Sequence, residues 1–405
     1  MEIQPVIAAL RKHKIPATLI VLEIALACAV LCNAVFMIGH RLGEMHLPNA
    51  IDQNGIVDIN VQGTDPKLAN ADIPRDVAAL RKIPGVAAAA AANSLPLSGI
   101  SQNYSVTSQS GGVYNRGSPT ISVYYLGNGG SRALDLRLLQ GRFFNNDEYA
   151  GGALTEAGYP SAHAAIVTRS LAQRLWSDGK ALGRQFWIGK NAYTVVGIVA
   201  NVPRPIKPYG STNAIYWDAF FPMNPNAALT NYVIRTAPQN RQRVMRAAMA
   251  RMETLSPNAV VKGQTFTDIR DKYFATTRSM VWMLVQVCIV MLLVTAFSIV
   301  GLTSFWVGQR RRQIGIRRAL GASRGHIMQY FQTENFLLST LGVVLGVILA
   351  YGANLYLMAH YQLDRMPWYY LPASAVMLWI LGQLAVLGPA LRASNVPPVV
   401  ATRSV

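Results

Sequence analysis

The sequence predicts an α-helical membrane protein with four transmembrane helices and a large α+β domain, built of two lobes, inserted between the first and second helices. Of its 405 residues, 51% are hydrophobic and only 14% are charged, whereas soluble domains carry about 25% charged residues. Four apolar runs are long enough to cross about 30 Å of hydrocarbon. Between the first two runs lies a long stretch of ordinary soluble composition, residues 43–275. A purely water-soluble protein is therefore not expected.

The four apolar runs are found at residues 15–38, 280–307, 336–358 and 370–391. The first run is longer than the apolar core of a signal peptide, and no A-x-A cleavage site follows it, so we expect an uncleaved anchor. With their flanking residues, the runs divide the chain into an N-terminal segment (1–14), four transmembrane helices (15–42, 276–307, 329–358 and 370–391), the inserted domain (43–275), two loops (308–328 and 359–369) and a C-terminal tail (392–405).

The distribution of Lys and Arg predicts the orientation of these helices. Six arginines and no acidic residue lie in the loop 308–328, and Arg11, Lys12 and Lys14 precede the first run. Because basic residues concentrate on the cytoplasmic side, we expect both termini and the loop 308–328 in the cytoplasm, and residues 43–275 and 359–369 outside it. The net charge of +18 then reflects topology and contact with anionic lipid rather than a nucleic-acid partner.

The inserted domain alternates short β-rich runs with helical runs, which is typical of an α+β domain. Stretches rich in Ser, Gly and Asn at 101–119 and rich in Gly at 150–160 are expected to be loops or lobe boundaries. The expected strands are 55–61, 120–126, 164–168, 193–199 and 232–235, and the expected helices are 75–82, 170–176 and 241–255.

The sequence offers no catalytic centre, metal site or cofactor site. The six histidines are scattered, and the three cysteines, Cys28, Cys32 and Cys288, lie inside apolar runs, as small packing residues do. The stretch from Gly183 to Asn191 resembles a phosphate loop, but five residues separate its glycines and Asn replaces the hydroxyl that would bind Mg²⁺. We expect a hairpin there instead, with Lys190 and Asn191 at its turn.

Polar residues inside apolar runs are costly and often functional. Glu23 and Glu334 lie near the cytoplasmic ends of their runs, which favours pairing with neighbouring arginines or helix capping over a proton relay. Gly342 and Gly346 form a GxxxG motif that lets helix backbones approach closely. They are expected to pack against another helix, either within this chain or in another membrane subunit.

The loop from Gln309 to Met328 combines arginines with small residues. If it is helical, Ile314, Arg317, Arg318 and Gly321 recur along one face. Its cations could then meet an acidic protein surface, and its small residues would allow that partner to approach. The alternative is a basic helix that lies on the bilayer and binds only lipid.

Residues 314–322 of this loop read I-G-I-R-R-A-L-G-A, and here the sequence resembles the MacB/FtsX-like permeases of ABC systems. Their loop typically reads R-R-R-E-I-G-I-R-R-A-L-G-A, so Gln313 stands where the family usually has Glu. Similar stretches occur at 83–86, 95–99, 141–144, 165–176 and 193–199. The tail P-A-L-R-A-S, which begins at Pro389, is close to the family's ending, with Pro397 where Asp is usual. The resemblance covers nearly the whole chain.

The resemblance implies a four-span subunit of a type VII ABC assembly in the cell inner membrane, with a large periplasmic domain and a second, identical or related permease. It also implies a separate cytoplasmic ATPase, which would hold ATP and Mg²⁺, because only residues 1–14 precede the first span. No cofactor is expected in this chain. The residues implied to couple to the ATPase are Ile314, Gly315, Ile316, Arg317, Arg318, Ala319, Leu320, Gly321, Ala322 and Ser323.

Three functions remain open within this family. The permease could export peptides, antibiotics or other amphiphiles by mechanotransmission, often with a periplasmic adaptor and an outer-membrane channel. It could extract lipoproteins, as permeases of the Lol type do, or regulate a periplasmic partner in the manner of FtsX, although the large inserted domain argues against the small-domain FtsX type. A secondary transporter would need more spans and polar groups at the membrane midplane. We expect export to be the function.

Overall fold

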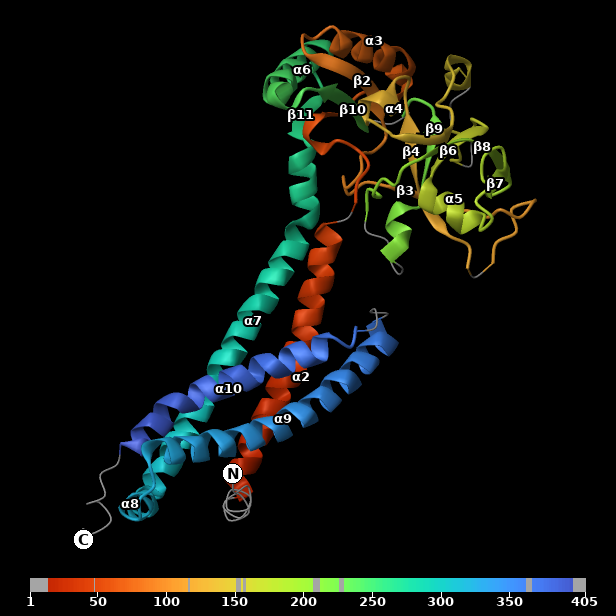
Figure 1. Ribbon diagram of the computed structural model, residues 1–405. Coiled ribbons are helices and arrows are strands. Elements are labelled where there is room, and N and C mark those ends of the chain that lie inside the picture. Colours follow the sequence, from red (N-terminus) through yellow and green to blue (C-terminus); the bar gives the residue numbers. More distant parts are fainter. Residues whose placement is uncertain are drawn as a thin grey trace. The chain divides into compact units, whose positions relative to one another are not determined.

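The computed structural model describes residues 14–46, 48–115, 117–150, 154–155, 158–206, 212–225, 229–361 and 366–395. The chain divides into two compact units, one drawn from residues 1–45 and 277–405 and the other from residues 46–276. Long helices make up the first, which we call the helical unit, and all the labelled strands lie in the second, which we call the inserted unit (Figure 1).

Four helices are long and apolar enough to cross a membrane: α2 (Lys14–Met45), α7 (Phe266–Gln309), α9 (Arg324–Tyr361) and α10 (Tyr370–Ser394). The short helix α8 (Arg311–Ala319) lies between α7 and α9 in the chain. The inserted unit follows α2, so the predicted fold class, with four apolar helices and an α+β domain after the first, is confirmed.

Two helices begin earlier than the apolar runs predict. Helix α7 begins at Phe266, well before residue 276, because Thr265 and Asp268 cap it reciprocally. The Thr265 amide donates to Asp268 Oδ2 (2.9 Å) and the Asp268 amide donates to Thr265 Oγ1 (3.3 Å), as in a capping box. Helix α9 begins at Arg324, inside the expected loop 308–328. Hydrogen bonding at the first turn, and not hydropathy, therefore determines where these helices start.

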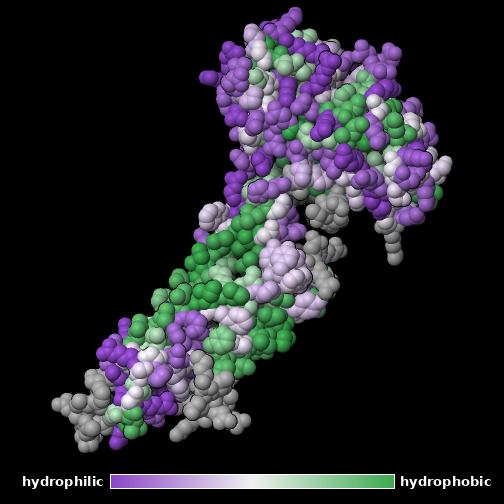
Figure 2. Space-filling model, in the orientation of Figure 1, coloured by the Kyte–Doolittle hydropathy of each residue, from purple (hydrophilic) through white to green (hydrophobic). Residues whose placement is uncertain are grey.

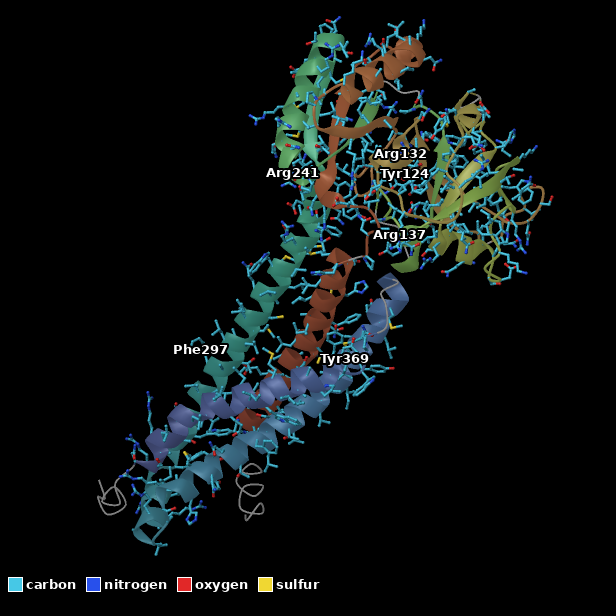
Figure 3. All side chains as sticks on the ribbon, turned by 45° about the horizontal axis from the view of Figure 1, so that its top comes forward. Tyr124, Arg132, Arg137, Arg241, Phe297 and Tyr369 are labelled. Carbon is cyan, nitrogen blue, oxygen red and sulfur yellow. The ribbon has the colours of Figure 1, made fainter. Side chains whose placement is uncertain are left out.

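The exposed surface of the helical unit is largely apolar along its length. Hydrophobic residues cover its middle, whereas hydrophilic residues gather at the end that carries α8 (Figure 2). Phe297 on α7 and Tyr369 before α10 are 73% and 54% exposed (Figure 3). Such side chains are suited to contact with lipid, with the tyrosine near the membrane surface.

The inserted unit is built on an 11-stranded sheet with the order β11-β1-β10-β2-β4-β9-β6-β8-β5, in which β3 also pairs with β4 and β7 with β8. Its strands are β1 (Ile56–Gln62), β2 (Val86–Ala92), β3 (Gln102–Ser105), β4 (Thr120–Leu126), β5 (Leu138–Gly141), β6 (Ala164–Thr168), β7 (Gln185–Ile188), β8 (Asn191–Val199), β9 (Asp218–Pro222), β10 (Leu229–Thr236) and β11 (Val260–Thr265). Its helices are α3 (Ala69–Arg81), α4 (Gly130–Ala133), α5 (Arg169–Leu175) and α6 (Arg241–Leu255).

The expected strands and helices of this unit overlap β1, β4, β6, β8, β10, α3, α5 and α6. Strand β3 lies within the expected loop 101–119, where it pairs with β4. The stretch from Gly183 to Asn191 forms the expected hairpin, but its turn residues are Gly189 and Lys190, one position earlier than predicted, because Ile188 pairs with Asn191. Gly189 has a φ of 61°, which suits a two-residue hairpin turn.

Each half of the sheet has its own hydrophobic core. Side chains of β1, β2 and β10 pack with α3 and α6, with Ile59, Leu80 and Val244 fully buried among them. The other half packs Val123, Phe186 and other side chains into a second core that includes residues of α5. This arrangement corresponds to two lobes.

The two half-sheets meet between β2 and β4, where Ala92 and Leu126 form the single register pair. Asn93, the residue after β2, strengthens this junction. Its side chain accepts from the Tyr125 amide (2.8 Å) and donates to the Val123 carbonyl (3.2 Å), and its own carbonyl accepts from Asn231 Nδ2 (3.0 Å). One asparagine therefore bonds to a strand of each lobe.

Candidate functional site

The predicted coupling segment folds as helix α8 followed by a tight turn into α9. Gly321 has a φ of 98°, and the amides of Gly321 and Ala322 donate to the carbonyls of Arg318 (3.1 Å) and Arg317 (3.0 Å). This is the Schellman pattern that ends helices at glycine. Ser323 Oγ then accepts from the His326 amide (3.2 Å), which caps the start of α9. Gly321 and Ser323 thus shape the turn.

One side of α8 faces the other helices. Ile314 is buried in the core of the helical unit. The Arg317 guanidinium lies 5.0 Å from the centre of the Tyr330 ring, within cation–π range. Arg318 Nη1 donates to the carbonyl of Ser394 at the end of α10 (3.1 Å). From their spacing, Arg317 and Arg318 were expected on a surface that faces a partner. In the structure, Arg317 also contacts α9 and Arg318 also contacts α10.

The opposite side of α8 is exposed and partly apolar. Ile316 is 45% exposed and Leu320 is 82% exposed, and their spacing of four residues places them next to each other along the helix. Arg312, Gln313 and Ala319 are exposed as well. The result is an apolar pair bordered by cationic and polar groups. We call Ile316 and Leu320 the apolar pair of α8.

A buried ion pair joins the start of α8 to α9. Arg310 Nη1 lies 3.1 and 3.2 Å from the two carboxylate oxygens of Glu334, and the side chains of Arg310 and Glu334 are only 11% and 2% exposed. The sequence predicted that Glu334 would pair with an arginine or cap a helix, and it pairs. Arg310 lay outside the predicted coupling residues, since nothing in the local spacing distinguishes it from Arg311 and Arg312.

Gly342 and Gly346 of α9 pack against α2. A Cβ atom at Gly342 would lie 2.7 Å from Ile24 Cβ, and one at Gly346 would lie 2.5 Å from Cys28 Cβ and 2.7 Å from the Ala25 carbonyl oxygen. Side chains cannot occupy these spaces. Of the two alternatives that the motif left open, these contacts correspond to packing within the chain.

The inserted unit contains buried acidic groups that the sequence analysis did not single out. Asp58 on β1 is 1% exposed and accepts from Gln264 Nε2 (3.0 Å), and burial raises the pKa of its carboxyl to about 7. Burial likewise raises the pKa of Asp218, which the positive charge of nearby Arg204 opposes. Asp58 lies in a strand that the sequence predicts, whereas β9, which holds Asp218, was not among the expected strands. Only three-dimensional burial distinguishes the two residues from exposed aspartates.

These groups do not assemble into a recognisable catalytic centre. Arg204 donates to Ser122 Oγ (2.7 Å) and Asn103 Oδ1 (2.9 Å), and the Tyr124 hydroxyl donates to the Pro203 carbonyl (3.0 Å); Tyr124 is labelled in Figure 3. Within the described ranges, no group of three or more His, Cys, Asp or Glu side chains is arranged to hold a metal ion. The part of the molecule best suited to an interaction is α8.

Two family models match the chain. Residues 18–261 match the MacB-like periplasmic core domain, and residues 286–398 match the FtsX-like permease C-terminal domain. The chain is 25% identical over 244 residues to the macrolide export ATP-binding/permease protein MacB of Chromobacterium violaceum, covering 58% of this chain and 35% of that protein. It thus spans about a third of the length of that relative.

The chain is also similar to a permease without a fused ATP-binding domain in its name and to two solved external domains. The uncharacterized ABC transporter permease YknZ of Bacillus subtilis is 20% identical over 317 residues, which cover 76% of each chain. The solved extracellular domain of YknZ from Gram-positive bacteria has a TM-score of 0.33 at 16% identity, covering 51% of this chain and 99% of that one. The solved periplasmic region of MacB from Actinobacillus actinomycetemcomitans has a TM-score of 0.36 at 12% identity, covering 55% of this chain and 94% of that one.

The first family model alone covers more than half of the chain, and the second covers most of α7, α9 and α10. Together they confirm the resemblance that the loop around α8 suggested. The chain belongs to the MacB/FtsX-like, type VII family of ABC-transporter permeases.

Proposed function

We propose that this chain is the permease subunit of an ABC complex that exports peptides, antibiotics or other amphiphiles. A separate cytoplasmic ATPase binds α8, and its ATP-driven movement passes through the helices to the inserted unit on the other side of the membrane. The observation that carries this proposal is the exposed apolar pair of α8, Ile316 and Leu320. Export is favoured because the MacB relatives are named macrolide export proteins.

The position of the apolar pair favours a protein partner over lipid alone. A basic helix that only lies on a bilayer needs one apolar face. In α8, Ile314 is buried against the neighbouring helices, whereas Ile316 and Leu320 point elsewhere and are exposed. A partner groove that received both side chains, with acidic groups near the arginines of α8, would remove this apolar surface from water and add charge-assisted hydrogen bonds.

The Leu320→Asp variant should abolish capture of the ATPase. The substitution would place an unpaired carboxylate in an apolar groove, at a cost of several kcal/mol if it is fully desolvated. Membrane insertion should be unchanged, because Leu320 lies outside the spans. The measurement is the amount of ATPase that co-purifies with the tagged full-length chain at matched membrane expression.

Leu320→Met is the matched control, because it keeps an apolar side chain of similar volume, and it should retain the ATPase. Arg317→Ala should weaken capture in a salt-sensitive way. Equal ATPase recovery and turnover with Leu320→Asp would identify α8 as a lipid-facing helix and refute the proposal.

The proposed orientation places both termini and α8 in the cytoplasm and the inserted unit in the periplasm. A cysteine at the exposed Ser110 should react in intact spheroplasts with a thiol reagent that cannot cross the inner membrane. A cysteine at the exposed Gln313 should react only after permeabilisation. The reverse labelling pattern would invert the proposed topology.

The composition of the purified complex would separate export from the two related functions. An ATPase recovered with a periplasmic adaptor and a second permease would support export. A lipoprotein carrier in place of the adaptor would indicate lipoprotein extraction, and a cell-wall hydrolase would indicate an FtsX-like regulatory role. Mass spectrometry of chains that co-purify in mild detergent distinguishes these outcomes.

A further inference from the structure

The ion pair between Arg310 and Glu334 is unusual for its position. Arg310 is the residue between α7 and α8, where its amide donates to the Trp306 carbonyl (3.0 Å) and its carbonyl accepts from the Ile314 amide (2.9 Å). Its side chain, 11% exposed, turns away from the surface toward a carboxylate on α9 that is 2% exposed. The neighbouring Arg311 and Arg312 are exposed. One arginine of a consecutive run of three is thus directed into the helical unit.

Aromatic rings complete the surroundings of this ion pair. The Trp306 ring centre lies 5.8 Å from the Arg310 guanidinium carbon, and the Tyr330 hydroxyl oxygen lies 3.5 Å from Arg310 Nη1. A second arginine, Arg317 of α8, also contacts Tyr330, because its guanidinium lies over the same ring. Glu334 and Tyr330 are one helical turn apart on α9. Arginines before and near the end of α8 therefore both contact one short stretch of α9.

A buried ion pair is weak evidence for added stability, because desolvation of both groups offsets their attraction. Its better-attested effect is to select one arrangement over others, since any arrangement that separates the charges leaves each one buried and uncompensated. Here the pair links the residue between α7 and α8 to α9, so the arrangement at stake is the angle at which α8 leaves α7. That angle decides where the apolar pair of α8 points.

We propose that Arg310 and Glu334 are positioning residues that fix α8 against α9, so that a push on α8 moves α9 instead of only tilting α8. The consequence for coupling rests on the proposed function, whereas the fixing of α8 does not. The Glu334 side chain is 2% exposed and acts through Arg310. Loss of the pair should leave the exposed residues of α8 available for capture while removing their fixed direction.

The test measures the direction of α8 in the full-length chain in lipid nanodiscs, with Cys28, Cys32 and Cys288 replaced by alanine. Spin labels at two exposed positions, Gln313→Cys on α8 and Leu341→Cys on α9, give a distance distribution by pulsed electron paramagnetic resonance. The chain with Arg310 and Glu334 intact should show a single narrow distance. Glu334→Gln, which keeps the shape of the side chain but removes its charge, should lose that narrow distance.

Matched variants separate positioning from a general loss of structure. Arg311→Gln removes a neighbouring exposed charge and should keep the narrow distance. The reversed pair, Arg310→Glu with Glu334→Arg, should restore it, which mere destabilisation would not allow. Arg310→Gln serves as a second variant if Glu334→Gln accumulates poorly, and it should also lose the narrow distance. An unchanged narrow distribution in the single variants would overturn the proposal.

The functional part of the test uses the co-purifying ATPase. Glu334→Gln should retain ATPase recovery but lose the change in protease sensitivity of the inserted unit on adding ATP and Mg²⁺. If the chain with intact Arg310 and Glu334 recovers no ATPase, the proposed function fails, and the distance measurement still decides whether the ion pair fixes α8. If Glu334→Gln responds to ATP like the unsubstituted chain, the pair has no part in coupling.

Discussion

Replacing Gly346 by leucine should prevent α2 and α9 from packing and leave little folded protein. The first atom of the new side chain would already lie 2.5 Å from Cys28 Cβ and 2.7 Å from the Ala25 carbonyl oxygen, so the two helices would have to separate. Overpacking of a tight interface typically costs 1–3 kcal/mol, and because the backbone of α2 itself stands in the way we expect at least about 3 kcal/mol here. The measurement is the thermal unfolding of the detergent-purified chain, together with its yield.

Gly352→Leu is the matched control on the same helix. A Cβ atom there meets nothing within 4 Å, and the residue is exposed, so its yield and melting temperature should stay close to those of the unsubstituted chain. If both variants behave alike, close packing of α2 against α9 at Gly346 does not determine the stability of the helical unit. Sensitivity of Gly346 alone is the result expected from the contacts of this glycine with Ala25 and Cys28.

Replacing Asp58 by asparagine should stabilise the inserted unit, and more so at alkaline pH. Burial raises the pKa of Asp58 from 3.8 to about 7, so the folded state holds a proton that the unfolded chain releases. Stability from this group is therefore complete below pH 3.8 and is lost as the pH rises toward 7. The difference between the two pKa values corresponds to about 4 kcal/mol of lost stability above pH 7. Asparagine stays neutral throughout and avoids that loss.

The measurement compares melting temperatures of the full-length chain at pH 5 and pH 8. Asp58→Asn should raise the melting temperature at both pH values. The gain at pH 5 should be less than half of the gain at pH 8, because the folded state mostly keeps the Asp58 proton at pH 5. Asp147→Asn, at an exposed position, controls for the change in net charge. A destabilised Asp58→Asn variant at pH 8 would mean that the carboxylate is charged and paired in the folded protein.

The four long apolar helices could be predicted because a bilayer requires an apolar run of a minimum length to cross it. A run such as 370–391 must be apolar throughout to cross hydrocarbon, and α10 begins at Tyr370 as expected. The start of α7 could not be predicted in the same way. It depends on two polar side chains, Thr265 and Asp268, that precede the apolar run and satisfy the first amides of the helix.

The candidate site could be predicted only in part, because its geometry also depends on contacts that the local sequence does not contain. The helix was expected to continue through Gly321, whereas α8 ends at Ala319 and Gly321 lies in the turn that follows it. The cluster of arginines predicts a cytoplasmic surface. The contacts of Arg318 with Ser394 and of Arg310 with Glu334 join residues far apart in the chain. Helical spacing orders side chains on one helix only, so it gave no means of knowing which arginines would turn inward. The apolar pair, Ile316 and Leu320, is more exposed than Arg310, whose side chain turns inward.

The junction between β2 and β4 has a consequence for how the inserted unit unfolds. Strands that share a long ladder open together, but Ala92 and Leu126 form a single register pair, reinforced by the bonds of Asn93. With a separate hydrophobic core on either side, each half-sheet can lose its hydrogen bonds while the other keeps its own. We therefore expect amide hydrogen exchange to report two distinct opening free energies within one continuous sheet, one for β1, β2, β10 and β11 and another for β4, β6, β8 and β9.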